Sequence, residues 1–308
     1  MVTVPTATHR LTVHSSSTIP GFSGALLLTF VSLVAITTAS AQWIGKQTGC
    51  YADSLVANPN RPTVANPADI TQYGVLELEY GWDRIWPQRD VHQTTFEGLL
   101  KFGLLCDIEL RWTTTSFLSQ TTGNVTQSGF GDNWLGPQIR IYKQTRRVPT
   151  LAFSYAVKIP SADSDNGLGT GRVDHALTFL ASKDIEHIHF DFNATQFWIG
   201  RQSARGFDRN NQLNLAFSFQ LHGPLQFTGE FYGDTEVNRE SPGFASSLWA
   251  LTYTVRPRLV IDSGYEAGLT GGGPHRHVFA GLTYSIGNLY PGWRRRHGQS
   301  NRGAEDAR

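Results

Sequence analysis

The sequence predicts an all-β fold, a closed antiparallel up-and-down transmembrane β-barrel of about 12 strands. Apolar and polar residues alternate at period two in many short segments, and the connections between these segments alternate between short and long. Beyond the N-terminus, no apolar run approaches the roughly 20 residues that a spanning helix needs. Of the 308 residues, 17% are charged, 12% are aromatic and 31 are glycines, a mixture that suits strands and turns better than helices.

Residues 1–41 are predicted to be a signal peptide. Arg10 precedes an apolar core from Gly21 to Ile36, and Ala39-Ser40-Ala41 supplies a small-x-small cleavage site. The alternative is a single membrane anchor, but the core is shorter than a spanning helix requires. Residues 42–70, rich in Asn, Pro and Thr, are then expected to form an irregular periplasmic segment.

Residues 71–290 are predicted to form the barrel. Its first strand has Leu76, Leu78 and Tyr80 on one face and Glu77 and Glu79 on the other. The same alternation recurs in twelve segments: 76–83, 96–102, 108–112, 135–142, 151–157, 173–179, 187–193, 213–220, 225–232, 249–255, 259–266 and 278–286.

The connections are the second argument for a barrel. The short ones are 105–107, 143–148, 182–186, 222–224 and 256–258. The long ones are Asp83–Gln93, Thr114–Asn133, 159–171, 200–210, 235–246 and 267–276. Outer-membrane barrels have short periplasmic turns and longer extracellular loops, which produces this alternation.

A soluble β-sandwich would show a similar alternation, so the chemistry of the two faces decides. The polar face holds almost no Lys, although soluble surfaces and edges are usually rich in it. The apolar face is dominated by Phe, Leu, Trp and Tyr, as in a face that contacts lipid. In lipid every backbone group must be paired, so the sheet must close. Outer-membrane lipid and the barrel-insertion machinery are the expected partners.

Several short motifs between residues 71 and 290 resemble a known family. These are Gly131-Asp132, Ile159–Asp163 (IPSAD), Gly169–Gly171 with Asp174, Ser182-Lys183, Leu259–Gly264 (LVIDSG), Gly268-Leu269 and Phe279–Leu282. In order and spacing they resemble the bacterial outer-membrane barrels labelled "putative MetA-pathway of phenol degradation". The resemblance implies an outer-membrane location and uptake of aromatic or other hydrophobic compounds.

The C-terminus departs from many outer-membrane barrels, which end on an aromatic residue of the last strand. Gly281, Tyr284 and Ile286 fit a G-x-x-apolar-x-apolar insertion pattern, but the basic sequence Trp293–His297 follows. We expect an internal insertion signal and a disordered basic tail over residues 291–308.

The polar faces supply the candidate functional residues. Those predicted to line the lumen are Glu77, Glu79, Glu97, Lys101, Glu109, Arg111, Arg140, Asp174, His187, His189, Asp191, Glu230 and Asp262. Because both signs of charge occur, we expect a narrow, partly self-plugged passage. The predicted function is a channel for passive uptake of small organic solutes, hydrophobic or aromatic ones among them. A non-conducting structural or ligand-binding barrel is the alternative.

Metal and cofactor sites are not predicted. His187, His189 and Asp191 share a face and would suit zinc or copper, but polar lining of a lumen explains them better. Asp163, Asp165, Gly167 and Asp174 resemble a calcium loop but lack its sixth-position Gly and twelfth-position Glu.

An enzyme is not predicted either, because no compact motif joins the serines and histidines; a barrel lipid hydrolase is the weaker alternative. The net charge of +1 gives no reason to expect a nucleic-acid partner. The two cysteines, Cys50 and Cys106, leave open whether they pair.

Overall fold

The computed structural model describes residues 54–88, 91–202, 204–237 and 241–290. The predicted signal peptide and basic tail lie outside these residues. Thirteen strands follow one another: β1 (Val75–Gln88), β2 (Val91–Leu105), β3 (Ile108–Thr122), β4 (Val125–Gly129), β5 (Asn133–Tyr142), β6 (Thr150–Ile159), β7 (His175–Ile185), β8 (Ile188–Gly200), β9 (Phe207–His222), β10 (Leu225–Asp234), β11 (Phe244–Arg256), β12 (Leu259–Gly268) and β13 (Arg276–Asn288). Among the described residues no helix is long and apolar enough to cross a membrane.

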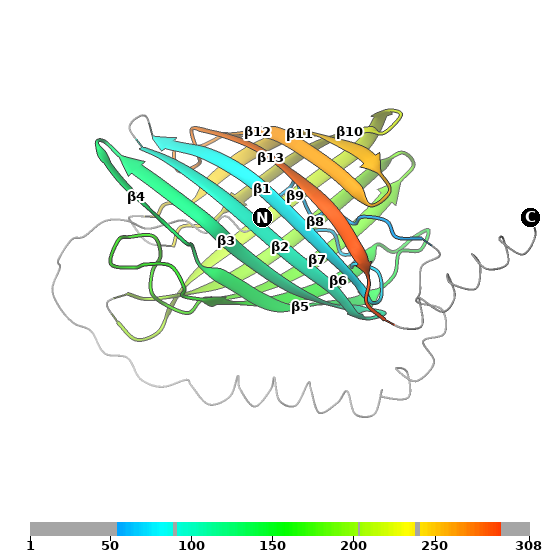
Figure 1. Ribbon diagram of the computed structural model, residues 1–308, viewed down its shortest axis with the longest axis horizontal. Helices are drawn as coiled ribbons and strands as arrows, with labels where there is room; N and C mark the ends of the chain where they lie inside the picture. The colour runs from blue at the N-terminus through cyan, green and yellow to red at the C-terminus, as the bar shows by residue number, and fades with distance from the viewer. Residues whose placement is uncertain (1–53, 89–90, 203, 238–240, 291–308) are drawn as a thin grey trace, which may run out of the picture. The chain divides into compact units, whose positions relative to one another are not determined.

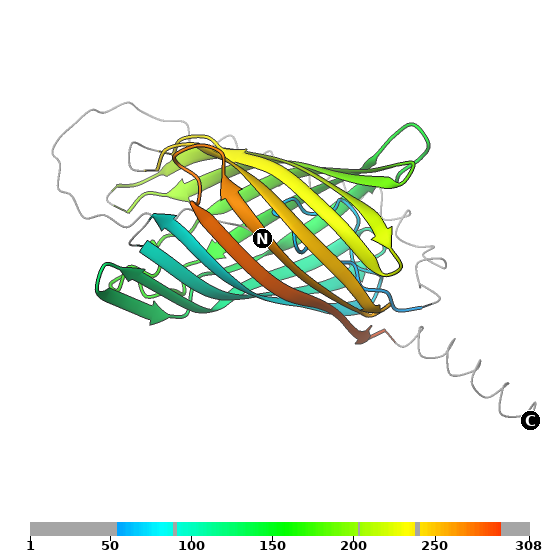
Figure 2. The same cartoon turned by 90° about the horizontal axis from the view of Figure 1, so that it is seen from above.

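The sheet closes on itself, because β1 pairs with both β2 and β13, and β2 also pairs with β3. Every neighbouring pair is antiparallel, and the tilted strands surround a common interior (Figures 1 and 2). β3 pairs with β4 over Leu118–Thr122 and with β5 over Ile108–Thr114, so β4 and β5 share one position in the barrel. The closed twelve-stranded antiparallel barrel is confirmed.

The two faces of the sheet are inverted relative to a soluble protein. Outward residues such as Trp112 and Leu135 are 47% and 50% exposed, whereas Lys101 and Glu77 are completely buried. Apolar side chains outside and charged side chains inside are the arrangement that a barrel surrounded by lipid requires.

The two ends of the barrel differ in their connections. At one end β1 begins, β13 ends, and tight turns join β2 to β3, β7 to β8, β9 to β10 and β11 to β12; we call it the short-turn end. Cys106, in the β2–β3 turn, is disulfide-bonded; the sequence has one other cysteine, Cys50, which lies outside the described residues. The opposite, long-loop end holds the β6–β7, β8–β9, β10–β11 and β12–β13 loops.

Two connections predicted as long loops are largely strand. Within the predicted loop Asp83–Gln93, β1 continues to Gln88 and β2 begins at Val91. Within Thr114–Asn133, β3 continues to Thr122 and returns as β4. These hairpins carry polar residues on both faces, so the period-two contrast disappears while backbone pairing continues; Thr121 and Thr126 hydrogen-bond across β3 and β4 at 2.9 Å.

Leu215 and Leu221 provide a test of lipid contact, since both are exposed on the outer face of β9. Leu215 lies at the middle of the strand and Leu221 near its short-turn end. We expect Leu215→Arg to lower the free energy of unfolding by about 2–4 kcal/mol and Leu221→Arg by about 0–1 kcal/mol. Urea unfolding in lipid vesicles, followed by heat-modifiable gel migration, measures both; equal effects would contradict a lipid-facing β9.

Candidate functional site: the barrel interior and its inner segment

Residues 54–74, which we call the inner segment, lie inside the barrel (Figures 1 and 2, blue). Within the described ranges they form no ladder with the sheet, and one isolated bridge joins Tyr73 to Gly103. Ala65 and Ala68 are completely buried. An irregular segment is predicted here from the sequence, but its position inside the barrel is not.

Glutamates of the barrel wall bind the backbone of the inner segment. Glu230, on β10, accepts hydrogen bonds from the N–H groups of Val64 and Ala65, each at 2.7 Å, and from Asn214 at 3.1 Å. Glu109 likewise accepts from the N–H of Thr71 at 2.6 Å. A buried N–H group without a partner is costly, so these carboxylates replace the hydrogen bonds that secondary structure would supply.

A charged cluster fixes the beginning of the inner segment. Lys101 lies 2.8 Å from Glu77 and 2.6 Å from Glu79, and all three side chains are almost completely buried. Glu77 accepts from the N–H of Asn58 at 2.9 Å and Glu79 from that of Asn60 at 2.8 Å. Lys101 donates in turn to the Asn58 carbonyl and the Asn60 side chain. Removing Lys101 would leave two buried carboxylates without their cation.

Arg61 extends these buried charged contacts from the inner segment to β12. Its guanidinium donates to both oxygens of Asp262 on β12, at 3.1–3.3 Å. Gly81 and Gly281 lie opposite each other on β1 and β13, and a Cβ at either would approach the guanidinium to 2.3 Å. The paired glycines therefore leave room for this side chain.

The other side of the inner segment is bound mainly by neutral groups. Asn66 and Asn193 exchange two backbone–side chain hydrogen bonds, at 2.7 and 2.8 Å. Arg111 donates to Asn66 at 2.9 Å and to Gln138 at 2.6 Å, and Gln138 donates to the Pro67 carbonyl at 2.9 Å. The inner segment is thus bound to opposite sides of the barrel wall.

The structure gathers most of the predicted lumen residues around the inner segment. Those that contact it directly or through one neighbour are Glu77, Glu79, Lys101, Glu109, Arg111, Arg140, Asp191, Glu230 and Asp262. Asp174 is buried against Lys158 at 2.5 Å, nearer the long-loop end, and Glu97 lies near Asp83. His189 contacts Asp184 and Asp191, but His187 is exposed in the β7–β8 turn instead of on the strand.

A second buried network, around His277, is not predicted from the sequence. His277, on β13, lies 2.6 Å from Glu266 and 3.1 Å from Asp83, and Glu266 also accepts a hydrogen bond from Tyr232. The alternation places each of these residues on a polar face, but nothing local in the sequence shows that the four strands β1, β10, β12 and β13 bring them together.

The loop that resembled a calcium site has another structure. Asp163 caps its own turn: Asn166 donates to its carboxylate from backbone and side chain, and these bonds hold the pKa of Asp163 below its ordinary value. Asp174 is bound to Lys158 instead. Within the described ranges, no group of three or more His, Cys, Asp or Glu residues is arranged to hold a metal ion.

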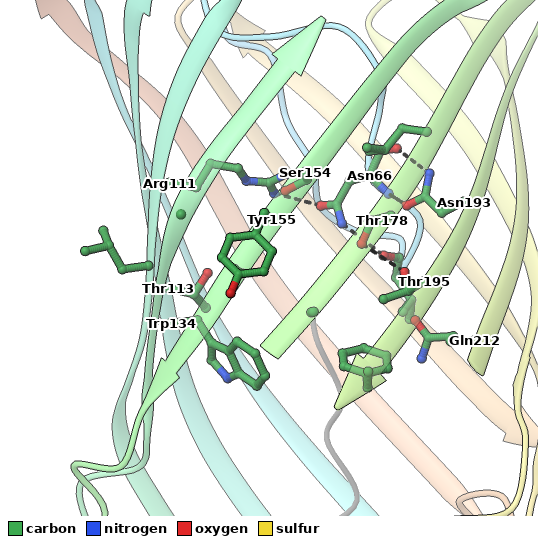
Figure 3. Close-up of a pocket in the computed structure, with 17 residues that line it drawn as sticks. Asn66, Arg111, Thr113, Trp134, Ser154, Tyr155, Thr178, Asn193, Thr195 and Gln212 are labelled. Carbon is green, nitrogen blue, oxygen red and sulfur yellow. Dashed lines mark hydrogen bonds between the residues drawn. The ribbon is translucent and has the colours of Figure 1, made fainter. Parts of the chain in front are cut away.

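A cavity that is partly open to solvent lies beside the inner segment (Figure 3). Its wall comes from β3 and β5–β9, together with Val64 and Asn66. Trp134 and Phe197 form an apolar side with Ala176, while Thr178, Thr195, Asn193 and Gln212 bring hydroxyl and amide groups. An aromatic surface beside a few polar groups is typical of sites for small organic molecules.

Residues 60–286 match the model of a family described as "Putative MetA-pathway of phenol degradation". The chain belongs to this family. The family resemblance drawn from the short motifs is therefore confirmed, and with the closed sheet and its apolar exterior it makes the protein an outer-membrane β-barrel. The sequence matches none of the curated proteins with which it was compared.

Solved barrels resemble this family member at low sequence identity. The NanC porin is 11% identical, with 68% of this chain and 100% of the porin covered and a TM-score of 0.46. The CymD monoaromatic hydrocarbon channel is 8% identical, with 71% and 90% covered and a TM-score of 0.38. The translocator domain of autotransporter NalP from Neisseria meningitidis is 10% identical, with 82% and 98% covered and a TM-score of 0.44.

The bond between Glu230 and the inner segment can be tested by hydrogen exchange. In Glu230→Ala, the amides of Val64 and Ala65 lose their acceptor, so we expect them to exchange at least about tenfold faster. The matched control is Glu236→Ala, which removes an exposed glutamate of the β10–β11 loop. Unchanged exchange of both amides in a folded Glu230→Ala barrel would contradict the observed contact.

The place where the inner segment meets Gly103 of β2 is also tightly packed. A Cβ on Gly103 would lie 2.1 Å from the backbone carbonyl oxygen of Gln72, so Gly103→Ala must displace the segment or the strand. We expect a loss of about 1–3 kcal/mol in the free energy of unfolding. Gly287→Ala, which would meet no atom within 4 Å, serves as control and should unfold like the wild type.

Proposed function

We propose that this protein is a passive channel for small organic solutes in the outer membrane, with the inner segment narrowing its periplasmic end. The cavity beside the inner segment carries this proposal, because it combines aromatic and polar surface inside a closed barrel. Membership of a family described by phenol degradation supports small hydrophobic or aromatic compounds as the solutes. The side chains predicted to line the lumen then set the width of the passage.

The way in which the inner segment is held supports a route for solute past this segment. The segment is held by hydrogen bonds and ion pairs, and its backbone contacts the wall mainly through side chains, with no continuous sheet ladder among the described residues. Local openings of such segments require less free energy than unfolding the barrel. Solute could therefore pass when part of the segment moves aside.

A second candidate function is a non-conducting, ligand-binding barrel. The observation that favours it is the same inner segment, since Lys101, Glu77 and Glu79 are buried and fully engaged with it. If those contacts never open, solute would enter the cavity from the long-loop end and go no further.

Conductance separates the two candidates. In planar bilayers we expect the wild-type barrel to show small discrete current steps. Glu230→Ala should raise their size or frequency severalfold, because two hydrogen bonds that hold the inner segment are lost. Swelling of vesicles in benzyl alcohol measures passage of an uncharged aromatic solute in parallel.

Glu236→Ala, in the exposed β10–β11 loop, is the matched control and should conduct like the wild type. Heat-modifiable migration shows that each variant is folded. Folded barrels that give neither current nor swelling, in the wild type and in Glu230→Ala, would overturn the channel and leave the ligand-binding barrel.

A further inference from the structure

The wall of the cavity contains a continuous row of inward polar side chains. Cross-strand register places Ser154 opposite Thr178, Thr178 opposite Thr195, and Thr195 opposite Gln212, on β6 to β9. Thr178 and Thr195 share a hydrogen bond of 3.0 Å, and Figure 3 shows the row along one side of the cavity. The row therefore runs from strand to strand as a band of hydrogen-bonding groups.

This row ends at a carboxylate. Asp234, on β10, lies directly opposite Gln212 in the register and so continues the same inner row, one strand beyond the residues that line the cavity. Asp234 is 8% exposed, and within the described part of the chain neither of its oxygens has a hydrogen-bond partner. The amide of Gln212 lies beside it but falls short of hydrogen-bond geometry, and its nitrogen is also buried without a partner.

The cations nearest the cavity are already engaged. Arg111 donates to Gln138 and Asn66 and lies 3.7 Å from Glu109. Lys158 lies 2.5 Å from Asp174 and 3.4 Å from Asp132. Neither side chain is paired with Asp234, so the carboxylate at the end of the row has no cation partner among the described residues.

Aromatic surface lies on the long-loop side of the row. Phe197 is two residues beyond Thr195 on β8, and it packs with Trp134 and Ala176 in one buried cluster. A ring placed against Trp134 and Phe197 would gain edge-to-face or stacked contacts. The same ring would have the polar row along one edge, with Asp234 one strand beyond Gln212 at the end of that row.

We propose that the cavity binds small arylalkylamines, such as benzylamine, in their ammonium form. The ring would lie against Trp134 and Phe197 and the ammonium group at Asp234. An ammonium group supplies both the charge and the donors that the Asp234 oxygens lack. An uncharged aromatic solute leaves that carboxylate unpaired, and an aromatic carboxylate is repelled by it. This inference rests on the proposed function in naming the preferred solute, but binding itself does not require passage.

Three ligands of nearly equal shape test the proposal: benzylamine, benzyl alcohol and benzoate. Calorimetric titration of the folded, full-length barrel in detergent at neutral pH gives the three affinities. We expect benzylamine to bind at least about tenfold more tightly than benzyl alcohol, and benzoate to bind most weakly. In Asp234→Asn the preference for benzylamine should fall to less than about threefold.

Two further variants make the result specific. Asp165→Asn removes an exposed carboxylate from the β6–β7 loop and should keep the full preference. Phe197→Ala should weaken benzylamine and benzyl alcohol by the same factor, because it removes ring contact and no charge. Heat-modifiable migration again shows that each barrel is folded.

The proposal is overturned if no ligand binds the wild type, if benzoate binds as tightly as benzylamine, or if Asp234→Asn keeps the preference. Because titration needs no conductance, its failure is distinct from failure of the channel. A barrel that conducts but ignores the charge of the ligand would keep the proposed function and exclude this site.

Discussion

The interior of this barrel depends on one constraint: a chain without regular secondary structure must find partners for its backbone N–H groups away from bulk water. Wall carboxylates meet that requirement. Glu77, Glu79, Glu109 and Glu230 each accept from the backbone of the inner segment, and the prolines between those contacts carry no N–H to satisfy. The positions of the wall carboxylates therefore fix the path of the segment, and the segment in turn supplies the donors that these carboxylates need.

The same constraint explains why so many charges are buried. A barrel in lipid turns its apolar side chains outward, so its interior must be held together by polar contacts. Some carboxylates that receive no N–H group from the segment are matched by a cation, as Asp262 is by Arg61 and Asp174 by Lys158. Asp234 has neither kind of partner among the described residues, and this leaves a bare carboxylate at the end of the polar row beside the cavity.

The barrel itself could be predicted because its signal is local. Alternation within one strand, as in Leu76 to Glu79, and the lengths of successive connections need no knowledge of distant residues. The signal failed where both faces of a hairpin become polar, as in β3 and β4, and at the β7–β8 turn, where one residue of shift moved His187 out of the predicted strand.

The contents of the barrel could not be predicted, because their partners are remote. Val64 and Glu230 are 166 residues apart, and Arg61 and Asp262 are 201 apart. Each glutamate of a polar strand face has the same local sequence context, whether it binds the segment, a cation or nothing. Only the closed sheet decides which of these occurs.

The remote partners of the inner segment also constrain the order of assembly. Its contacts reach β1, β3, β8, β10 and β12, strands from both ends of the chain. The residues that leave the ribosome before any strand can therefore take their places only after the final strand has closed the sheet. Until that moment the buried lysine and its glutamates need water or another chain around them, so closure of the sheet and burial of these charges occur together.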